Sequence, residues 1–184
     1  DDPNWKDRDC FVLSGGHESA LIYTMLTYIG WLEIEDLKKF RQLGSRTPGH
    51  PERILTPGIE ATTGPLGQGV GNALGMAVAE CILRNHFGED VVNHYTYCLH
   101  GDGDIQEPVS QGTIALAGHW GVGKLINYYD ANNAQISGNM PRSDSTNYVQ
   151  MYQSHGWHVQ EIDGHDRNAI RDAIRKAQME VGMP

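Results

Sequence analysis

Two short polar loops, each directly after an apolar run, constrain the fold of this chain more than any other feature. The first is GDG at 101–103 within LHGDGDIQEP, and the second is the Asn pair within YYDANNAQISG at 128–138. Asp102 and Asn132 lie about 30 residues apart, the length of one helix plus one strand. This spacing predicts two neighbouring parallel strands that bring both loops to the carboxyl edge of one sheet, where open α/β sheets bind ligands.

The residue types in these loops favour a divalent metal ion held beside a diphosphate. Asp102 and Asn132 offer side-chain oxygens, and an exposed backbone carbonyl, assigned to Ala134, offers a third. Hard oxygen ligands suit Mg²⁺ or Ca²⁺ rather than zinc. Alternatively, Asp102 and Asn132 are turn-forming residues of βα loops. Their joint spacing and flanking residues favour the metal site.

The apolar patterns elsewhere predict an α/β fold, in which a parallel sheet carries helices on both faces. Strands are expected at 95–99, 125–129 and 157–162. Helices are expected at 109–118 after Pro108, at 145–155 and after Asp166, which acts as an N-cap. This β-α-β-α-β-α order implies right-handed crossovers. The first half is expected to be helix and loop, with helices at 19–29, 35–43 and 67–83.

Composition and charge exclude several classes of partner. A chain of 184 residues forms one domain, and its formal net charge of −9 argues against nucleic acid or an anionic membrane as a partner. Such an acidic surface is also poorly suited to capture phosphate without a metal. No apolar run is long enough to span a bilayer.

Cysteine usage and the chain ends complete this picture. Three cysteines without a CxxC motif signal neither a disulfide framework nor a zinc site, so an intracellular, cytoplasmic location is expected. The chain begins at Asp1 rather than Met and leaves a helical pattern at Gly182. We therefore expect residues 1–184 to be one domain of a longer polypeptide, truncated at both ends.

Three further segments carry a resemblance to a known family. They are RDCFVLSGGHESALIY at 8–23, FRQLGSRTPGHPE at 40–52 and GIEATTGPLGQGVGNALGMAVAE at 58–80. Together with GDG and the Asn loop, they resemble the diphosphate-binding domain of transketolase along essentially the whole chain. The resemblance implies a dimeric, thiamine diphosphate- and Mg²⁺- or Ca²⁺-dependent enzyme. Such an enzyme transfers a two-carbon ketol unit from a ketose phosphate, such as xylulose 5-phosphate, to an aldose phosphate, such as ribose 5-phosphate or erythrose 4-phosphate.

The resemblance also implies a role for each matching position. Asp102, Asn132 and the carbonyl of Ala134 match the metal ligands, and Gly103 matches an amide that contacts the diphosphate. The remaining positions are His17 near the cofactor phosphate, His50 near the hydroxyls of the donor sugar, Gly64 and Leu66 against the aminopyrimidine ring, and Glu107, an acid at the dimer interface. Without the resemblance, both histidines would be interpreted as surface or structural residues, and Glu107 as an acid favoured at a helix N-terminus.

Some features depart from the family pattern. Glu18 stands where relatives carry a small residue, Asp104 places a second carboxylate beside the metal loop, and QEP replaces the commoner EG ending. The pyrimidine-binding domain, whose glutamate activates the cofactor, and the residues that bind the sugar phosphate lie outside this sequence. We therefore expect the isolated chain to be inactive and its site to be completed by a pyrimidine-binding domain of the same or a partner subunit, in a homodimer.

Two other interpretations remain open. A deoxyxylulose phosphate synthase or a 2-oxo acid dehydrogenase E1 subunit shares the metal motif, although TPGHPE at 47–52 argues against both. The chain could also be a cofactor-holding subunit of a split enzyme, without catalysis of its own.

Overall fold

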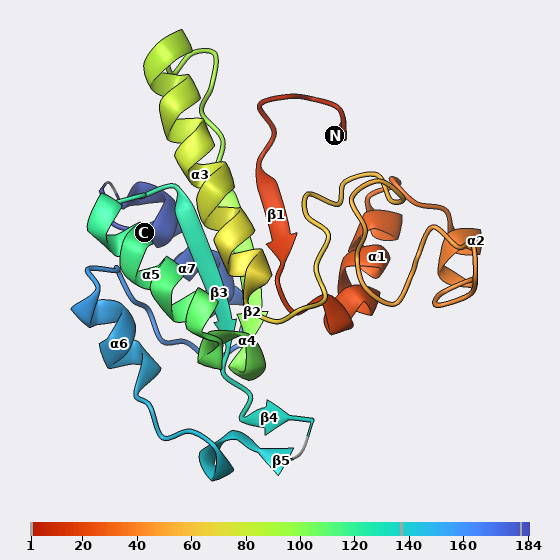
Figure 1. Ribbon diagram of the computed structural model, residues 1–184. Coiled ribbons are helices and arrows are strands. Elements are labelled where there is room, and N and C mark those ends of the chain that lie inside the picture. Colours follow the sequence, from red (N-terminus) through yellow and green to blue (C-terminus); the bar gives the residue numbers. More distant parts are fainter. Residues whose placement is uncertain (1, 137, 181) are drawn as a thin grey trace.

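A three-stranded parallel sheet lies at the centre of the computed structural model, which describes residues 2–136, 138–180 and 182–184 (Figure 1). The strands are β1 (Cys10–Leu13), β2 (Thr96–Gly101) and β3 (Leu125–Asp130), with β2 in the middle. The register pairs Leu13 with Leu99 and Gly101 with Asp130. The strands predicted at 95–99 and 125–129 are confirmed, with β2 shifted by one to two residues.

Helices and short extensions connect these strands. Before β2 lie η1 (Gly16–Glu18), α1 (Ser19–Tyr28), α2 (Ile34–Leu37) and α3 (Gln68–Phe87). The elements α4 (Asp102–Gln106) and α5 (Pro108–Trp120) join β2 to β3. After β3 come β4 (Ala134–Gln135), β5 (Gly138–Asn139), η2 (Met140–Arg142), α6 (Tyr148–Ser154) and α7 (Arg167–Met179). None of the described helices is both long and apolar enough to cross a membrane.

Alternating side chains of the strands divide the core between the two faces of the sheet. Val12, Cys98 and Leu125 face α3 and α5 and belong to one buried cluster. Leu13 points to the opposite face and packs with α1 in a second cluster. The C-terminal end of α7 also lies on that opposite face, where Gln178 hydrogen-bonds Tyr97. The prediction of helices on both faces of a parallel sheet is therefore confirmed.

Two strand predictions are wrong. The run Cys10–Leu13 forms β1, although the first half was expected to contain only helix and loop. The segment at 157–162 pairs with none of the described strands. Its apolar character reflects the packing of Trp157, which is buried and donates its indole N–H to the carbonyl of Ile114 in α5, 2.9 Å away. The helix expected at 35–43 is also shorter, because α2 ends at Leu37.

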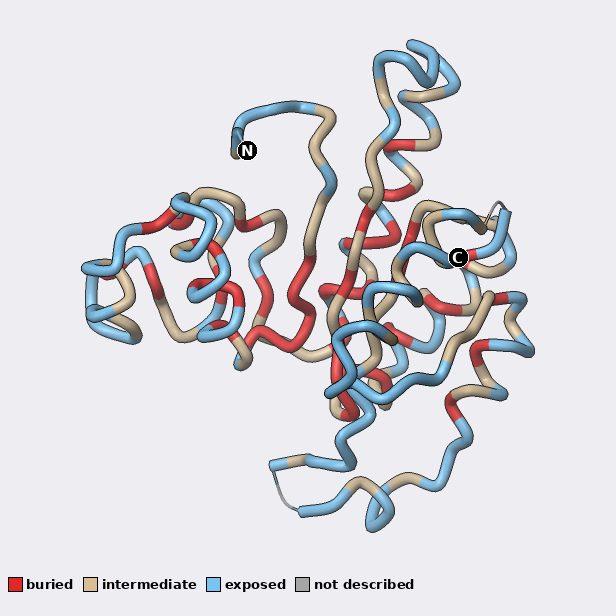
Figure 2. Tube along the Cα trace, turned by 180° about the vertical axis from the view of Figure 1, so that it is seen from behind, coloured by how far each residue is buried: buried red, intermediate tan, exposed pale blue. Residues whose placement is uncertain are grey.

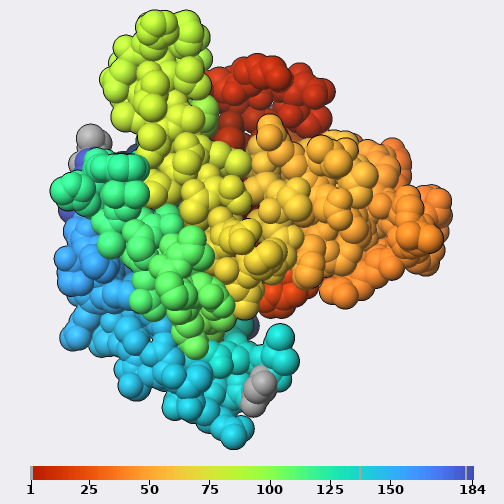
Figure 3. Space-filling view, in the orientation of Figure 1, coloured from red at the N-terminus to blue at the C-terminus, as the bar shows by residue number. Residues whose placement is uncertain are grey.

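Backbone conformation and close contacts explain two of the glycines at the start of α3. Gly67 has φ of +82°, a left-handed conformation that favours glycine. A Cβ on Gly69 would lie 2.5 Å from the Cα of Ser14, so α3 crosses the end of β1 at a distance only glycine allows. The last turns of α3 project from the rest of the molecule in the space-filling view (Figure 3).

A buried carboxylate joins three segments at the carboxyl edge of the sheet. Asp104 is 1% exposed. It accepts hydrogen bonds from the hydroxyl of Ser14 at 2.6 Å, from the N–H of Gly67 at 2.9 Å and from the N–H of Gly101 at 3.3 Å. Asp104 is therefore an internal cross-link between the end of β1, the start of α3 and the end of β2.

We expect Gly118→Ala to destabilise the protein by about 2 kcal/mol or more, since overpacking a tight contact forces backbone shifts. A Cβ at this position in α5 would lie 1.8 Å from the carbonyl oxygen of His155. The matched control is Gly112→Ala in the same helix, where a Cβ meets open space. The free energy of unfolding of that variant should rise by about 1 kcal/mol, because alanine has a higher helix propensity than glycine. Urea unfolding of both variants checks the pair, and a similar change in both would contradict this contact.

We expect Asp104→Ala to lower the free energy of unfolding by about 3 kcal/mol, because it leaves buried donors of Ser14 and Gly67 without an acceptor. Asp104→Asn retains one oxygen for those donors and should lose clearly less. Urea unfolding of the metal-free protein separates the two variants. A loss under about 0.5 kcal/mol for the alanine variant would show that Asp104 is not a cross-link.

Candidate diphosphate and metal site

The loops after β2 and β3 meet as the sequence predicts. Asp102 directly follows β2, and Asn132 lies two residues beyond β3. The backbone N–H of Ala134 lies 3.1 Å from Oδ2 of Asp102 and 2.8 Å from Oδ1 of Asn132. One oxygen of each predicted side-chain ligand therefore lies within hydrogen-bonding distance of the same backbone group, the N–H of Ala134.

The carboxylate of Asp102 is buried and held at both oxygens. Its exposed fraction is 2%, and the hydroxyl of Tyr129 donates to Oδ1 at 2.5 Å while Ala134 occupies Oδ2. Burial, followed by the hydrogen bond and charge of Asp102, raises the pKa of Tyr129 well above its usual range. Tyr129 therefore remains a protonated donor at neutral pH.

The loop that carries Asn132 is exposed, in contrast to Asp102 (Figure 2). The side-chain amide of Asn132 donates to Oδ2 of Asp130 at 2.8 Å, which turns its oxygen toward Ala134. Asn133 has φ of +59°, a left-handed conformation that asparagine tolerates better than most residues. The second asparagine of the pair therefore shapes the loop.

The donor set fits a hard divalent cation that also binds a diphosphate. The described residues contain no group of three or more His, Cys, Asp or Glu side chains able to hold a metal. A single carboxylate with an amide oxygen leaves most coordination positions to water and phosphate. Mg²⁺ is usually bound in this way, through one or two carboxylates and substrate phosphates.

Four of the remaining predicted positions come together in two pairs. Nδ1 of His50 lies 3.2 Å from the place a Cβ on Gly64 would take, and Cδ1 of Leu66 lies 3.0 Å from a Cβ placed on Gly103. The segment that carries Gly64 also touches the segment that carries His17, because a Cβ on Gly16 would lie 2.8 Å from the N atom of Gly64.

The backbone of His50 is fixed while its imidazole is exposed. Tyr23, which is fully buried, donates its hydroxyl to the carbonyl of His50 at 3.3 Å. Ser19 donates to the carbonyl of Gly49 at 2.7 Å. Two side chains of α1 therefore hold the TPGHPE loop in place, an arrangement suited to a positioned polar group.

The first departure from the family pattern, Glu18, lies against the end of β2. Its Oε1 is 3.6 Å from a Cβ placed on Gly101 and 3.9 Å from Nε2 of His17. Burial raises the pKa of Glu18, the charge of His17 opposes this shift, and the carboxylates of Asp130 and Asp104 add to it. Together these groups make this edge of the sheet acidic.

Glu107 lies at the N-cap of α5, directly before Pro108. Its Cβ is 2.8 Å from the place a Cβ on Gly67 would take, so it packs against the glycine turn at the start of α3. The predicted role of Glu107 at a dimer interface stays a prediction.

Sequence reasoning missed the side chains beneath Asp102. The sequence motifs assign no role to Tyr129 or Tyr152, and His100 is marked only by its place directly before GDG. His100 is fully buried, its Nε2 lies 2.9 Å from the hydroxyl of Tyr152, and its ring stacks on Tyr129. Burial lowers the pKa of His100 to about 4. The sequence signal that indicates burial of His100 is the alternation of side chains along β2, which places His100 on the same face as the buried Cys98.

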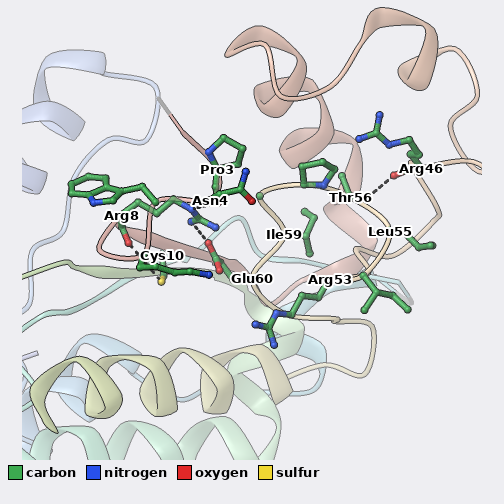
Figure 4. A pocket seen from close by; sticks show the side chains of 15 residues that line it. Pro3, Asn4, Arg8, Cys10, Arg46, Arg53, Leu55, Thr56, Ile59 and Glu60 are labelled. Carbon is green, nitrogen blue, oxygen red and sulfur yellow. Dashed lines mark hydrogen bonds and ion pairs between the residues drawn. The ribbon is translucent and has the colours of Figure 1, made fainter. Parts of the chain in front are cut away.

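A separate cleft of about 590 Å³ lies between the N-terminal segment and residues 53–60 (Figure 4). Its lining includes Arg8, which is paired with Glu60, and Arg46, which is paired with Asp36 at 3.3 Å. The cleft contains none of the predicted site residues.

Comparisons with known proteins agree with this geometry. Residues 1–184 match the family model described as transketolase, thiamine diphosphate binding domain. Transketolase 1 of Vibrio cholerae is 50% identical over 187 residues, which cover 99% of this chain and 28% of that protein. Transketolase 2 of Xanthobacter flavus is 49% identical over 188 residues, which cover 100% of this chain and 27% of that protein.

Solved structures give the same result. Transketolase from Leishmania mexicana superposes with a TM-score of 0.97 at 48% identity, covering 100% of this chain and 28% of that one. The chain thus spans little more than a quarter of the length of the relatives it matches. Because the family model matches it from residue 1 to residue 184, this chain belongs to the transketolase family.

Proposed function

We propose that this chain forms the diphosphate and metal side of a thiamine diphosphate site in a transketolase. The reaction is transfer of a two-carbon ketol unit from a ketose phosphate, such as xylulose 5-phosphate, to an aldose phosphate, such as ribose 5-phosphate or erythrose 4-phosphate. The observation that carries this proposal is the meeting of Asp102 and Asn132 at the N–H of Ala134, in a chain of this family.

Mg²⁺ or Ca²⁺ would be held by the carboxylate of Asp102, the amide oxygen of Asn132 and the carbonyl of Ala134. The bound metal would neutralise the diphosphate, and the cofactor would supply the carbanion chemistry. Gly103, directly after Asp102, would donate its amide N–H to the diphosphate. The backbones of Gly64 and Leu66 would contact the aminopyrimidine ring. The packing of Leu66 on Gly103 supports placing these contacts in one pocket.

His17 and His50 would have different tasks. His17, whose side chain is 60% exposed, would lie near the cofactor phosphate. His50 would accept and return protons at the hydroxyls of the donor sugar, since an imidazole is well suited to proton transfer near neutral pH. The fixed backbone and exposed ring of His50 support this role.

The proposed site would also use residues beyond the 184 described in this sequence. A pyrimidine-binding domain of the same or a partner subunit would form the opposite wall, and a homodimer would bring the two together. Glu107, packed at the start of α3 and α5, would then face the partner subunit.

We expect Asp102→Ala to abolish Mg²⁺-dependent binding of thiamine diphosphate, because the diphosphate would face an acidic edge without a held cation. The control is Asp90→Asn, which removes a charge from an exposed loop after α3 and should leave binding unchanged. Calorimetry on the complete enzyme measures both variants. Unchanged cofactor affinity in Asp102→Ala would overturn the proposed site.

We expect His50→Ala to lower donor turnover by roughly 10²-fold while the affinity for thiamine diphosphate is retained, since proton transfer contributes about 10²–10⁴-fold. His165→Ala, at an exposed position outside the site, is the control. The assay is ketol transfer from xylulose 5-phosphate to ribose 5-phosphate by the complete enzyme. Near-normal turnover of His50→Ala would return this residue to a structural role.

A further inference from the structure

We propose that Tyr129 is a positioning residue for Asp102, and that the buried pair His100 and Tyr152 holds Tyr129 in place. This inference rests on the proposed metal site. Its basis is a continuous set of contacts that runs from the core to the carboxylate and uses none of the predicted site residues except Asp102.

The first contact assigns a separate task to each oxygen of Asp102. Oδ1 accepts the hydroxyl of Tyr129 at 2.5 Å, whereas Oδ2 lies 3.1 Å from the N–H of Ala134 that Asn132 also contacts. Oδ2 therefore faces the same point as the oxygen of Asn132. Oδ2, on the side of Asn132, would therefore be the metal-facing oxygen, and Oδ1 the oxygen that fixes the rotation of the carboxylate.

The second set of contacts fixes the ring of Tyr129. The sheet register pairs Tyr129 with His100, so both side chains lie on one face. Their rings stack with centroids 5.3 Å apart and planes within 7°. Tyr148 of α6 also contacts the ring of Tyr129 in a T-shaped arrangement, with centroids 5.6 Å apart and planes at 76°. The hydroxyl of Tyr129 thus has little freedom to leave Asp102.

The third contact orients His100. Its Nε2 lies 2.9 Å from the hydroxyl of Tyr152, and the side-chain amide of Asn127 donates to that same hydroxyl at 3.3 Å. Asn127 and His100 therefore both bind the hydroxyl oxygen of Tyr152, and this contact holds the ring of His100 against Tyr129.

A held carboxylate matters because the site offers only one charged ligand. Partners that hydrogen-bond a metal ligand fix its orientation, and their loss typically weakens metal binding by about 10- to 100-fold. Asp102 without Tyr129 would retain Ala134 as its only described neutral donor and could rotate away from Asn132. Tyr129 therefore sets the affinity for the metal without touching it.

The test compares Tyr129→Phe with Tyr128→Phe in the complete enzyme. Each variant loses one hydroxyl from neighbouring residues of β3, and Tyr128 lies on the opposite face, stacked on Tyr97. The readout is the Mg²⁺ concentration that gives half-maximal binding of thiamine diphosphate to the metal-free protein. We expect an increase of about 10- to 100-fold for Tyr129→Phe and less than about twofold for Tyr128→Phe.

A purely structural role would not give this pattern. At saturating Mg²⁺, turnover of Tyr129→Phe should recover to within about threefold of the parent, because only metal affinity is lost. Tyr152→Phe, which removes the partner of His100 but leaves Tyr129 intact, should raise the Mg²⁺ requirement by at least about threefold. If Tyr129→Phe fails to fold, the Mg²⁺ requirement of Tyr152→Phe tests the positioning role in its place.

The outcomes separate the two proposals. Thiamine diphosphate binding by the parent protein that is independent of any divalent metal would overturn the metal site itself. A metal requirement in the parent, with equal Mg²⁺ dependence in Tyr129→Phe and Tyr128→Phe, would overturn only the positioning role of Tyr129.

Discussion

The buried carboxylate of Asp104 is the constraint on which the geometry of the site depends. Removing a carboxylate from water is unfavourable unless donors replace the lost hydration. Here the donors come from Ser14 after β1, Gly67 before α3 and Gly101 at the end of β2. Gly67 also brings the positive end of a 20-residue helix toward the charge. The segments that carry His17, Leu66 and Asp102 must therefore assemble together, because none of them can satisfy Asp104 alone.

The parallel sheet gives the site two layers of different character. One face of β2 and β3 packs on α3 and α5. At the carboxyl edge of the sheet, His100 and Tyr129 lie on this same face. Asp102 lies on that layer and is buried, whereas Asn132 lies in an exposed loop. One of the two proposed ligands is therefore fixed by the core before anything binds, and the other comes from a segment with fewer restraints. This asymmetry follows from strand register, since Gly101 and Asp130 end their strands side by side.

Sequence reasoning succeeded where a rule of topology acts on a local pattern. Polar residues after two neighbouring strands must meet at one edge, so the meeting of Asp102 and Asn132 followed from spacing. It failed where the structure depends on contacts between segments that are distant in the sequence. Four apolar residues at Cys10–Leu13 are too few to separate a strand from a buried loop, and the apolar residues interspersed at 157–162 include Trp157, which packs on α5. Sequence alone does not distinguish Tyr129 from other core aromatic residues, because the role proposed for it depends on its hydroxyl partner rather than on its neighbours in sequence.

The charge at this edge explains why the proposed metal and diphosphate would depend on each other. Asp102 is the charged ligand of the proposed site, and Asp104 is a second buried carboxylate two residues on. Burial, with a further contribution from the charges of Asp130 and Asp104, raises the pKa of Glu18. None of the predicted site residues is a lysine or arginine. A diphosphate entering alone would meet carboxylates, and a cation entering alone would find only one charged ligand and few protein oxygens. Each would therefore bind weakly without the other, since the cation compensates the repulsion and the diphosphate completes the coordination. The backbone N–H groups that satisfy Asp104 would reduce this repulsion at short range, so a second carboxylate is compatible with the proposed diphosphate site.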